Sequence, residues 1–452
     1  MRTSIRLCVL ILAILAVAFG QARISLLRPQ ASKLPGRSEG LLTQARFQPP
    51  APPAPKLIRA GRVLDVRIGT YLADQGILTD GERIKEIGPW GQVKVHAPAD
   101  AVLIDLSGQT LLPGLIDCHA HLLIGGELGR ISPGELISLT LTQSSQSMRV
   151  LLGVRNAREV LEAGITSARM MGHSGISGDV ALRDAINAGW IAGPRLQAAA
   201  RKIISLGGLP ITPEPALAAQ VFAQEFLTVS GPEQARQAVR QNMAAGADLI
   251  KIVVDSDAFR GLKPRYISLD DAKAIVAEAH RAGMKVAAHA GDNTAVQIAI
   301  DAGVDSIEHA WTATDDQLRQ MKDRGIWLVA TEIFVAASPK DRLQRAMKIG
   351  VKIAMGSDAW ADLPGKTRGE ASLVELKKLK DEGMPDIEIV RSSTINAAEL
   401  MGWSDHVGEL AAGKFADIIA VAGDPTQDAS LLQHVQFIMK GGAVIRNDFA
   451  KA

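Results

Sequence analysis

Two histidines, His119 and His121, stand at the end of a short apolar run that begins at Leu115. Side chains alternate between the two faces of a β-strand, so Asp117 and both imidazoles point to the same side. Cys118 points to the opposite side, where a free cysteine behaves as a small buried hydrophobe. Two imidazoles on one face of a strand can bind a single metal ion, although a His-x-His pair alone is equally typical of packed or surface histidines.

Three further candidate ligands lie at the ends of other apolar runs. His289 and His309 each close such a run, and Asp358 follows a third. Together with His119 and His121 they make five candidates at the ends of four predicted strands, and this grouping predicts a metal site. The remaining histidines are expected to be packed or solvated by default: His96, His173, His280, His406 and His434.

Lys251 interrupts the apolar run from Leu249 to Val254. A protonated amine cannot bind a metal cation, but a buried, deprotonated lysine can react with carbon dioxide to give a carbamate. The two oxygens of this anion can bridge two metal ions. The alternative is a lysine whose stem packs in the core while its ammonium group reaches solvent at the end of the strand.

Eight short apolar runs lie between residues 113 and 402, each followed by a stretch of helical character. This order predicts successive βα units, and eight of them close a (β/α)8 TIM barrel, whose active site lies at the C-terminal ends of the strands. An open doubly wound sheet is the alternative. The predicted strands are Gly114 to Cys118, Ile165 to Met170, Arg195 to Arg201, Leu249 to Val254, Lys285 to His289, Asp305 to His309, Trp327 to Thr331 and Lys352 to Gly356.

Both ends of this body have β character. Residues 57–112 contain short β-like runs broken by turns, and residues 403–452 return to the same pattern. An economical interpretation is that the two segments pair. The predicted fold class is therefore α/β, with a (β/α)8 barrel and a small β-sandwich domain formed from both chain ends.

The first 22 residues have the order of a secretory signal peptide. Arg2 and Arg6 precede the apolar run from Leu7 to Phe19, and small residues accompany its end. This run is shorter than the roughly 20 residues that cross a bilayer, so we expect no stable membrane insertion after signal removal. The expected location is periplasmic or secreted. Residues 23–56 are proline-rich and are predicted to form a linker.

The composition argues against several classes of partner. The chain has 452 residues, of which 47% are hydrophobic and 22% charged, as in ordinary globular proteins. Its formal net charge of +2 provides no field that would collect nucleic acid. Aromatic residues make up only 4%, which argues against stacking platforms for single strands. We expect no nucleic-acid partner, and a homo-oligomer is compatible with the sequence.

Several segments resemble the metal-dependent amidohydrolase superfamily, over about residues 57–447. Within it, residues 181–186, 193–196 and 408–417 are similar to the imidazolonepropionase-like branch, which includes Xaa-Pro and Xaa-Arg/Lys dipeptidases. The segments that carry the superfamily resemblance are Pro113 to His121, Lys251, the Ala-His-Ala around His289, Ser306 to His309 and Gly356 to Asp358.

The resemblance implies a (β/α)8 barrel with a β-sandwich and two divalent metal ions, expected to be zinc. It also implies that carbon dioxide carboxylates Lys251, which then bridges the two ions. The implied ligands are His119, His121 and Asp358 for one ion, and His289 and His309 for the other.

Two metals that share a hydroxide lower its pKa and polarise a substrate carbonyl. Asp358 is the candidate catalytic residue that takes the hydroxide proton and delivers it to the leaving nitrogen. This chemistry predicts a hydrolase of the amide bond in a small peptide or N-acyl amino acid, which the expected export favours. A cyclic-amide hydrolase or deaminase of imidazolonepropionase type is the alternative. A barrel merely stabilised by metal is a third possibility, but structural sites are normally closed.

The loop after the fourth predicted strand carries three cations and one of the two tyrosines of the chain. Such loops form the rim of a barrel active site. We expect Arg260 or Arg265 to pair with a substrate carboxylate, and Tyr266 to assist a tetrahedral oxyanion as a catalytic residue. Solvated charges on an exposed loop are the alternative. His173 is a further candidate substrate-binding residue.

Overall fold

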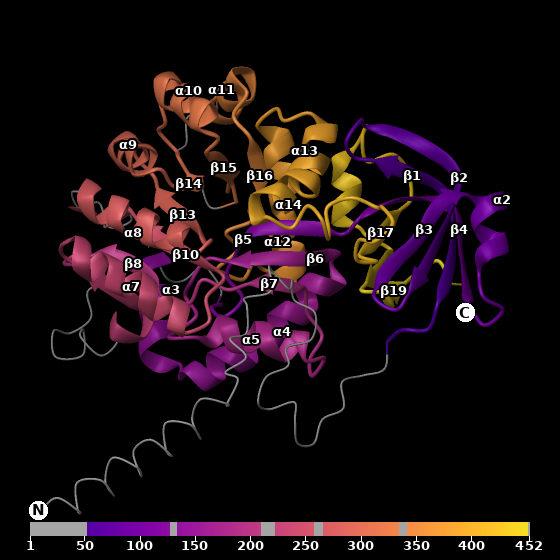
Figure 1. Cartoon of the computed structure of the whole chain (residues 1–452), viewed down its shortest axis with the longest axis horizontal. Helices are drawn as coiled ribbons and strands as arrows, with labels where there is room; N and C mark the ends of the chain where they lie inside the picture. Colours follow the sequence, from indigo (N-terminus) through magenta and orange to yellow (C-terminus); the bar gives the residue numbers. More distant parts are fainter. Residues whose placement is uncertain (1–51, 127–132, 209–221, 257–264, 334–340, 451–452) are drawn as a thin grey trace, which may run out of the picture. The chain divides into compact units, whose positions relative to one another are not determined.

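The computed structural model in Figure 1 describes residues 52–126, 133–208, 222–256, 265–333 and 341–450. The predicted signal peptide, residues 1–22, and most of the predicted linker lie outside these ranges, and so does Arg260. Within them, no helix is both long enough and apolar enough to span a bilayer.

The barrel has eight strand positions, called staves below, and each strand runs parallel to its barrel neighbours. Nine short strands fill the eight staves, because the third stave is divided into β7 and β8. Their hydrogen bonds run in two separate sheets, β5-β6-β7 and β16-β15-β14-β13-β10-β8-β9. Contacts between β16 and β5 complete the ring, where the Asp358 amide donates to the carbonyl of His119 over 2.8 Å. The staves are β5 (Leu115–Ala120), β6 (Ile165–Met170), β7 (Arg195–Gln197) with β8 (Lys202–Ser205), β10 (Leu249–Val253), β13 (Lys285–Ala290), β14 (Ser306–His309), β15 (Trp327–Ala330) and β16 (Ile353–Met355).

The third stave differs from the single strand predicted from Arg195 to Arg201. It stops at Gln197 and resumes at Lys202, because the carboxylate of Asp179 accepts hydrogen bonds from the amides of Ala199 and Ala200. Ala200 also has a left-handed φ of 56°, which an extended strand does not allow. A side chain distant in sequence therefore divides this strand, and only its second part pairs with β10.

Helices cover the outside of the strands (Figure 1). Several begin at a side-chain cap, as where Ser268, Asp292 and Thr314 accept from the amide three residues on. The main hydrophobic core fills the layer between strands and helices. The helices are α3 (Pro133–Gln143), α4 (Gln146–Glu162), α5 (Gly178–Asn187), α7 (Pro232–Ala244), α8 (Leu269–Arg281), α9 (Asn293–Ala302), α10 (Asp315–Arg324), α11 (Arg342–Ile349), α12 (Arg368–Asp381), α13 (Asp386–Ser392) and α14 (Ile395–Met401).

A second seven-stranded sheet combines strands from both ends of the described chain, in the order β19-β18-β17-β4-β1-β2-β3. The predicted pairing of the two ends is confirmed, since β17 lies antiparallel to β4. Residues 102–113, at the end of the first predicted β segment, form one long strand. The strands are β1 (Lys56–Asp65), β2 (Thr70–Asp80), β3 (Arg83–Pro89), β4 (Val102–Pro113), β17 (Ile418–Val421), β18 (Phe437–Lys440) and β19 (Ala443–Asn447).

Short elements complete the described chain. The helix α2 and the 3-10 turn η2 follow β3, and η4 precedes β18. The strand β9 extends the barrel sheet beyond β8, while β11 and β12 form a small hairpin after β10. Their bounds are α2 (Trp90–Val93), η2 (Lys94–His96), η4 (Ala429–Gln433), β9 (Phe226–Val229), β11 (Asp255–Ser256) and β12 (Arg265–Tyr266).

Candidate metal centre

Strand alternation directs the candidate ligands of β10 and β13 into the barrel. Leu249 and Ala287 pack in a small cluster inside the ring, apart from the main core between strands and helices. Lys251 and His289 lie two residues further along the same strands, so they occupy the same inner face nearer the C-terminal end. Both side chains are buried.

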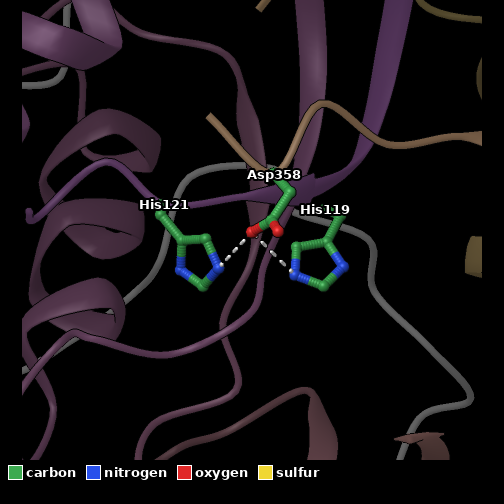
Figure 2. Close-up of side chains that lie close together, drawn as sticks. All are labelled: His119, His121 and Asp358. Atoms are coloured by element: carbon green, nitrogen blue, oxygen red, sulfur yellow. Dashed lines mark ion pairs between the residues drawn. The ribbon is translucent and has the colours of Figure 1, made fainter. Parts of the chain in front are cut away.

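His119, His121 and Asp358 form a compact group (Figure 2). The Nε2 atoms of His119 and His121 lie 3.4 and 3.2 Å from the Oδ1 atom of Asp358. One ligand atom from each of the three residues lies within 4.8 Å of the others, which suits a divalent metal ion. Gly356 permits this approach, because a Cβ there would come within 2.7 Å of the His119 side chain.

Hydrogen bonds at Nδ1 set the orientation of two imidazoles. The Nδ1 of His119 lies 2.7 Å from the Oε2 atom of Glu308, and the Nδ1 of His121 lies 3.0 Å from the carbonyl oxygen of Gly172. Both partners are acceptors, so each Nδ1 carries the proton and each Nε2 keeps its lone pair. Such partners fix the tautomer that a metal needs.

Glu308 belongs to a fully buried network that the sequence interpretation did not assign. Its Oε1 atom accepts from Arg169 at 2.9 Å and from the Ser306 hydroxyl at 2.6 Å. Arg169 also donates to the carbonyl of Cys118 at 2.8 Å. A detectable signal was the alternation in β14, which places Ser306 and Glu308 on one face. The Cys118 side chain packs toward α14, where its Sγ lies 3.9 Å from the carbonyl of Ala397.

The remaining candidate ligands lie beside this group. The ring centroid of His309 is 5.1 Å from that of His119 and 4.5 Å from that of His289. The Nδ1 of His309 is 2.7 Å from the Thr331 hydroxyl. Lys251 is 2% exposed, and its Nζ has no hydrogen-bond partner among the described residues.

The electrostatics favour neutral ligands. Burial, followed by nearby cations that include Lys251, holds the pKa of His119, His289 and His309 well below the ordinary 6.5. Burial likewise lowers the pKa of Lys251 to about 8. Metal binding requires unprotonated imidazoles, and this environment supplies them near neutral pH.

Left-handed backbone occurs at several positions of the site. His309 has φ 77°, Ala310 48°, Asp358 49° and His173 57°. These conformations are costly for residues other than glycine and persist where surrounding contacts impose them. Regular alternation in β14 directs Glu308 into the barrel and would direct His309 to the other face. The left-handed backbone at His309 breaks this alternation, so the His309 ring also lies beside His119. Buried Arg342 donates a hydrogen bond to the His309 carbonyl and so holds this conformation.

Asp255 is a buried carboxylate that the sequence interpretation missed. It lies 3.6 Å from the Nε2 of His289 and accepts from the amides of Gly291 and Asp292. Burial raises its pKa to about 6. Its position immediately after the apolar run of β10 was the available signal.

The predicted substrate-binding loop is only partly described. The Tyr266 hydroxyl donates to the Oδ2 atom of Asp292 at 2.6 Å, and exposed Arg265 donates to the carbonyl of Gly207 at 2.9 Å. Of these two residues, Tyr266 lies opposite Asp255 in the β11–β12 hairpin, and Asp255 is the carboxylate beside His289. His173 does lie at the site, with its ring centroid 5.2 Å from that of His121. The substrate roles of Tyr266, Arg265 and His173 stay predictions, as does that of Arg260.

Comparisons with known proteins agree with this architecture. The amidohydrolase family profile matches residues 110–446. Ochratoxinase of Aspergillus niger is 30% identical over 384 residues, which cover 74% of this chain and 75% of that protein. Imidazolonepropionase of Sphingopyxis alaskensis is 26% identical over 402 residues, covering 81% and 93%. A solved Xaa-Pro dipeptidase with methionine bound in the active site has a TM-score of 0.74 and 29% identity, covering 86% and 99%.

Proposed function

Because the chain belongs to the amidohydrolase family, we propose that it is an exported hydrolase that uses two zinc ions to cleave the amide bond of a small peptide or N-acyl amino acid. Family membership itself makes the chain a metal-dependent hydrolase of carbon–nitrogen amide bonds. The proposed parts are the export, the second metal ion, the identity of the metal and the class of substrate.

The observation that carries the proposal is the convergence of His119, His121 and Asp358 at the barrel end, beside two further buried imidazoles. The donor set fits metal ions, because burial keeps the imidazoles neutral and the buried Lys251 amine has no hydrogen-bond partner among the described residues. Divalent ions bound there supply an activated water and polarise the carbonyl that is attacked.

Lys251 would complete the second half of the centre as a carbamate. Its amine nitrogen attacks the carbon of carbon dioxide, a nitrogen–carbon bond forms and one proton leaves. The reaction needs an unprotonated amine, and burial, which lowers the pKa of Lys251 to about 8, increases the share of that form. The carbamate is an anion, whereas the unmodified lysine side chain is neutral or positively charged.

Asp358 is positioned to carry a proton during the reaction. Its side chain is 20% exposed, whereas those of His119 and His121 are 3% and 5% exposed. A carboxylate that is both at the ligands and accessible can take a proton from an attacking water and pass it to the leaving nitrogen. Glu308 and the carbonyl of Gly172 hold the two imidazoles while this happens.

Two relatives support different substrates. The similar solved structure is a Xaa-Pro dipeptidase, which favours a peptide or an N-acyl amino acid. The alternative, a cyclic-amide hydrolase or deaminase, is supported by the similarity to an imidazolonepropionase over 93% of that protein's length. Export of this chain, expected from residues 1–22, would expose it to peptides and environmental amides and is a reason to prefer the first.

A substrate screen on the zinc-loaded mature protein tests the proposal. We expect release of a free amino acid from a library of dipeptides and N-acyl amino acids. Formation of ammonia or of a ring-opened acid from cyclic amides, without peptide hydrolysis, would establish the alternative. Metal analysis of the same sample should give two ions per chain, and secretion of a reporter fused to residues 1–22 would test the export.

A further inference from the structure

A second buried lysine, Lys202, lies inside the barrel on β8 and is 7% exposed. Its Nζ atom is 2.8 Å from the Nε2 of His173. Gly172 makes room for it, because a Cβ at that position would come within 2.6 Å of the Lys202 stem. The amine is therefore held by its own stem, by one imidazole nitrogen and by the ring of Phe226, whose centroid is 5.2 Å from Nζ.

The ammonium group of Lys202 lacks a direct anionic partner. No carboxylate of the described residues forms an ion pair with it. The buried carboxylate of Glu225 is engaged instead by the guanidinium of Arg149. Since His173 accepts one of the three N–H bonds of an ammonium group, two donors are left for another partner. Burial lowers the pKa of Lys202 to about 7, so an anion bound beside the amine would favour its charged form and gain a charge-assisted hydrogen bond.

Lys202 is also close to the proposed reaction centre. The ring of its partner His173 lies 5.2 Å, centroid to centroid, from that of His121. Lys202 on β8 also lies beside Lys251 on β10, because these two strands are paired neighbours in the barrel sheet. A molecule that spans from the metal ligands to Lys202 would therefore need to be only a few bonds long.

The geometry points to Lys202 as the residue that binds a carboxylate of the substrate, with His173 as its positioning residue. This inference rests on the proposed amide hydrolysis and deepens it, because it assigns the expected substrate carboxylate to a buried donor inside the barrel in place of an arginine on the loop after β10. Arg265 is less suited to the role, since it is exposed and donates to the carbonyl of Gly207.

The chemical basis of this role is a charge-assisted hydrogen bond between the Lys202 ammonium group and the substrate carboxylate, in an interior that largely excludes water. An ammonium–carboxylate contact is stronger there than at the surface, where water and salt screen it. Binding the substrate carboxylate at Lys202 leaves the amide carbon free to reach the metal ligands. A neutral C-terminal amide of the same size would lose this contact and leave the lysine unpaired.

The first experiment uses the unmodified, metal-loaded protein. Matched pairs of N-acetyl amino acids and their C-terminal amides are compared, and each free amino acid is compared with its amide as an inhibitor. We expect kcat/KM to be about 10- to 100-fold higher for the acids, mostly through a lower KM. The free amino acids should likewise inhibit more strongly than their amides.

Two variants assign the preference to one residue. Lys202→Met keeps the stem but removes the charge, and it should abolish the preference for acids while changing the hydrolysis of the amides little. The matched control is Lys285→Met, which alters another barrel lysine at the opposite, N-terminal end of β13, where Nζ donates to the Leu400 carbonyl. This control should keep the preference. Metal content and melting temperature are measured for both variants.

The outcomes separate this inference from the proposed function. Equal hydrolysis or inhibition by acids and amides with the unmodified protein would overturn the role of Lys202 and leave amide hydrolysis intact. A Lys202→Met variant that loses both activities equally, or that only loses stability, would make Lys202 a structural counter-ion of Glu225. Absence of hydrolysis of all acyclic amides by the unmodified protein would instead reject the proposed function.

Discussion

The two halves of the candidate metal centre present their ligands differently. Around β5 and β16, His119 and His121 already have their Nε2 atoms within 3.4 Å of a carboxylate oxygen. Around β10 and β13, His289 faces the inside of the barrel together with Lys251, whose amine has no hydrogen-bond partner among the described residues. The first half contains a carboxylate ligand in the sequence, whereas in the second half the proposed bridging anion would have to be formed from Lys251, beside the buried carboxylate of Asp255.

This difference explains how the ligands of each half could be predicted from the sequence. A histidine or aspartate is a ligand as encoded, so its position after a strand is sufficient to nominate it. A lysine becomes a ligand only after a chemical change that burial permits. The two halves should therefore respond differently to substitution, and the largest effect is expected at Asp358.

Asp358→Asn should reduce kcat by about 10²- to 10⁴-fold, because the amide keeps the shape of the side chain but cannot carry a proton. The change is expected to leave the fold intact. Steady-state kinetics and the melting temperature of the same preparation check both parts. Near-normal turnover would show that Asp358 does not carry the proton, and the residues of the second half of the centre would then be tested for that role.

Lys251→Ala should lower the metal content and, with it, activity by at least about 10-fold, since the bridging anion is lost. Elemental analysis gives the metal-to-protein ratio, and carbon-13 spectroscopy of protein loaded with labelled carbon dioxide should show the carbamate only in the unmodified chain. Lys251→Arg serves as a control that keeps a cation but cannot be carboxylated. Two tightly bound metals with full activity in Lys251→Ala would refute the bridging role.

The acceptors at Nδ1 offer a finer comparison. Glu308→Gln removes the charged partner of His119 and should cost about 10- to 100-fold in metal affinity or activity. Thr331→Val removes only a hydroxyl from His309 and should cost about 2- to 10-fold. Metal titration of both variants gives the two values. Equal losses would show that the two halves depend on their outer contacts to the same degree.

The metal-free protein should lose stability in acid. Burial holds the pKa of His119, His289 and His309 well below 6.5 when folded, whereas the unfolded chain binds these protons near pH 6.5. Their stabilising contribution is therefore complete above about pH 6.5 and is lost as pH falls, by at most about 1.4 kcal/mol per pH unit for each histidine. Urea unfolding at about pH 7.5 and 5.5 measures this change. A His289→Gln variant should show a shallower dependence, and an unchanged slope would contradict the assignment.

The barrel strands could be predicted from the sequence because each is a short apolar run before a helical stretch. The predicted and observed ends of the strand from Ile165 to Met170 coincide. The interruption of the third strand could not be predicted, because it depends on hydrogen bonds that the Asp179 carboxylate, about 20 residues earlier, accepts from the amides of Ala199 and Ala200. Local alternation does not contain such contacts.

The candidate ligands were nominated by type and position, but the contacts that orient them were not. Glu308 lies 189 residues from His119 in sequence, so their hydrogen bond depends on the closed order of the strands. Lys202 was overlooked because the third strand was predicted to end at Arg201, one residue before it, whereas the observed strand β8 begins at Lys202. Tyr266 and Arg265 were selected for their chemistry and for their loop after the fourth strand; the structure shows their hydrogen bonds to Asp292 and Gly207, and their substrate roles stay predictions.

The sheet shared by the two chain ends has a consequence for biosynthesis. The hydroxyl of Thr110, on β4, donates to the carbonyl of Gly423, 313 residues away, and β17 pairs with β4 beside it. Closing so long a loop is entropically costly and slow, and it can happen only when the ribosome has made nearly the whole chain. Until then the edge of β4 is open to pairing with other chains. A nascent or C-terminally truncated chain is therefore expected to need a chaperone to stay out of aggregates, even though every metal ligand has already been synthesised.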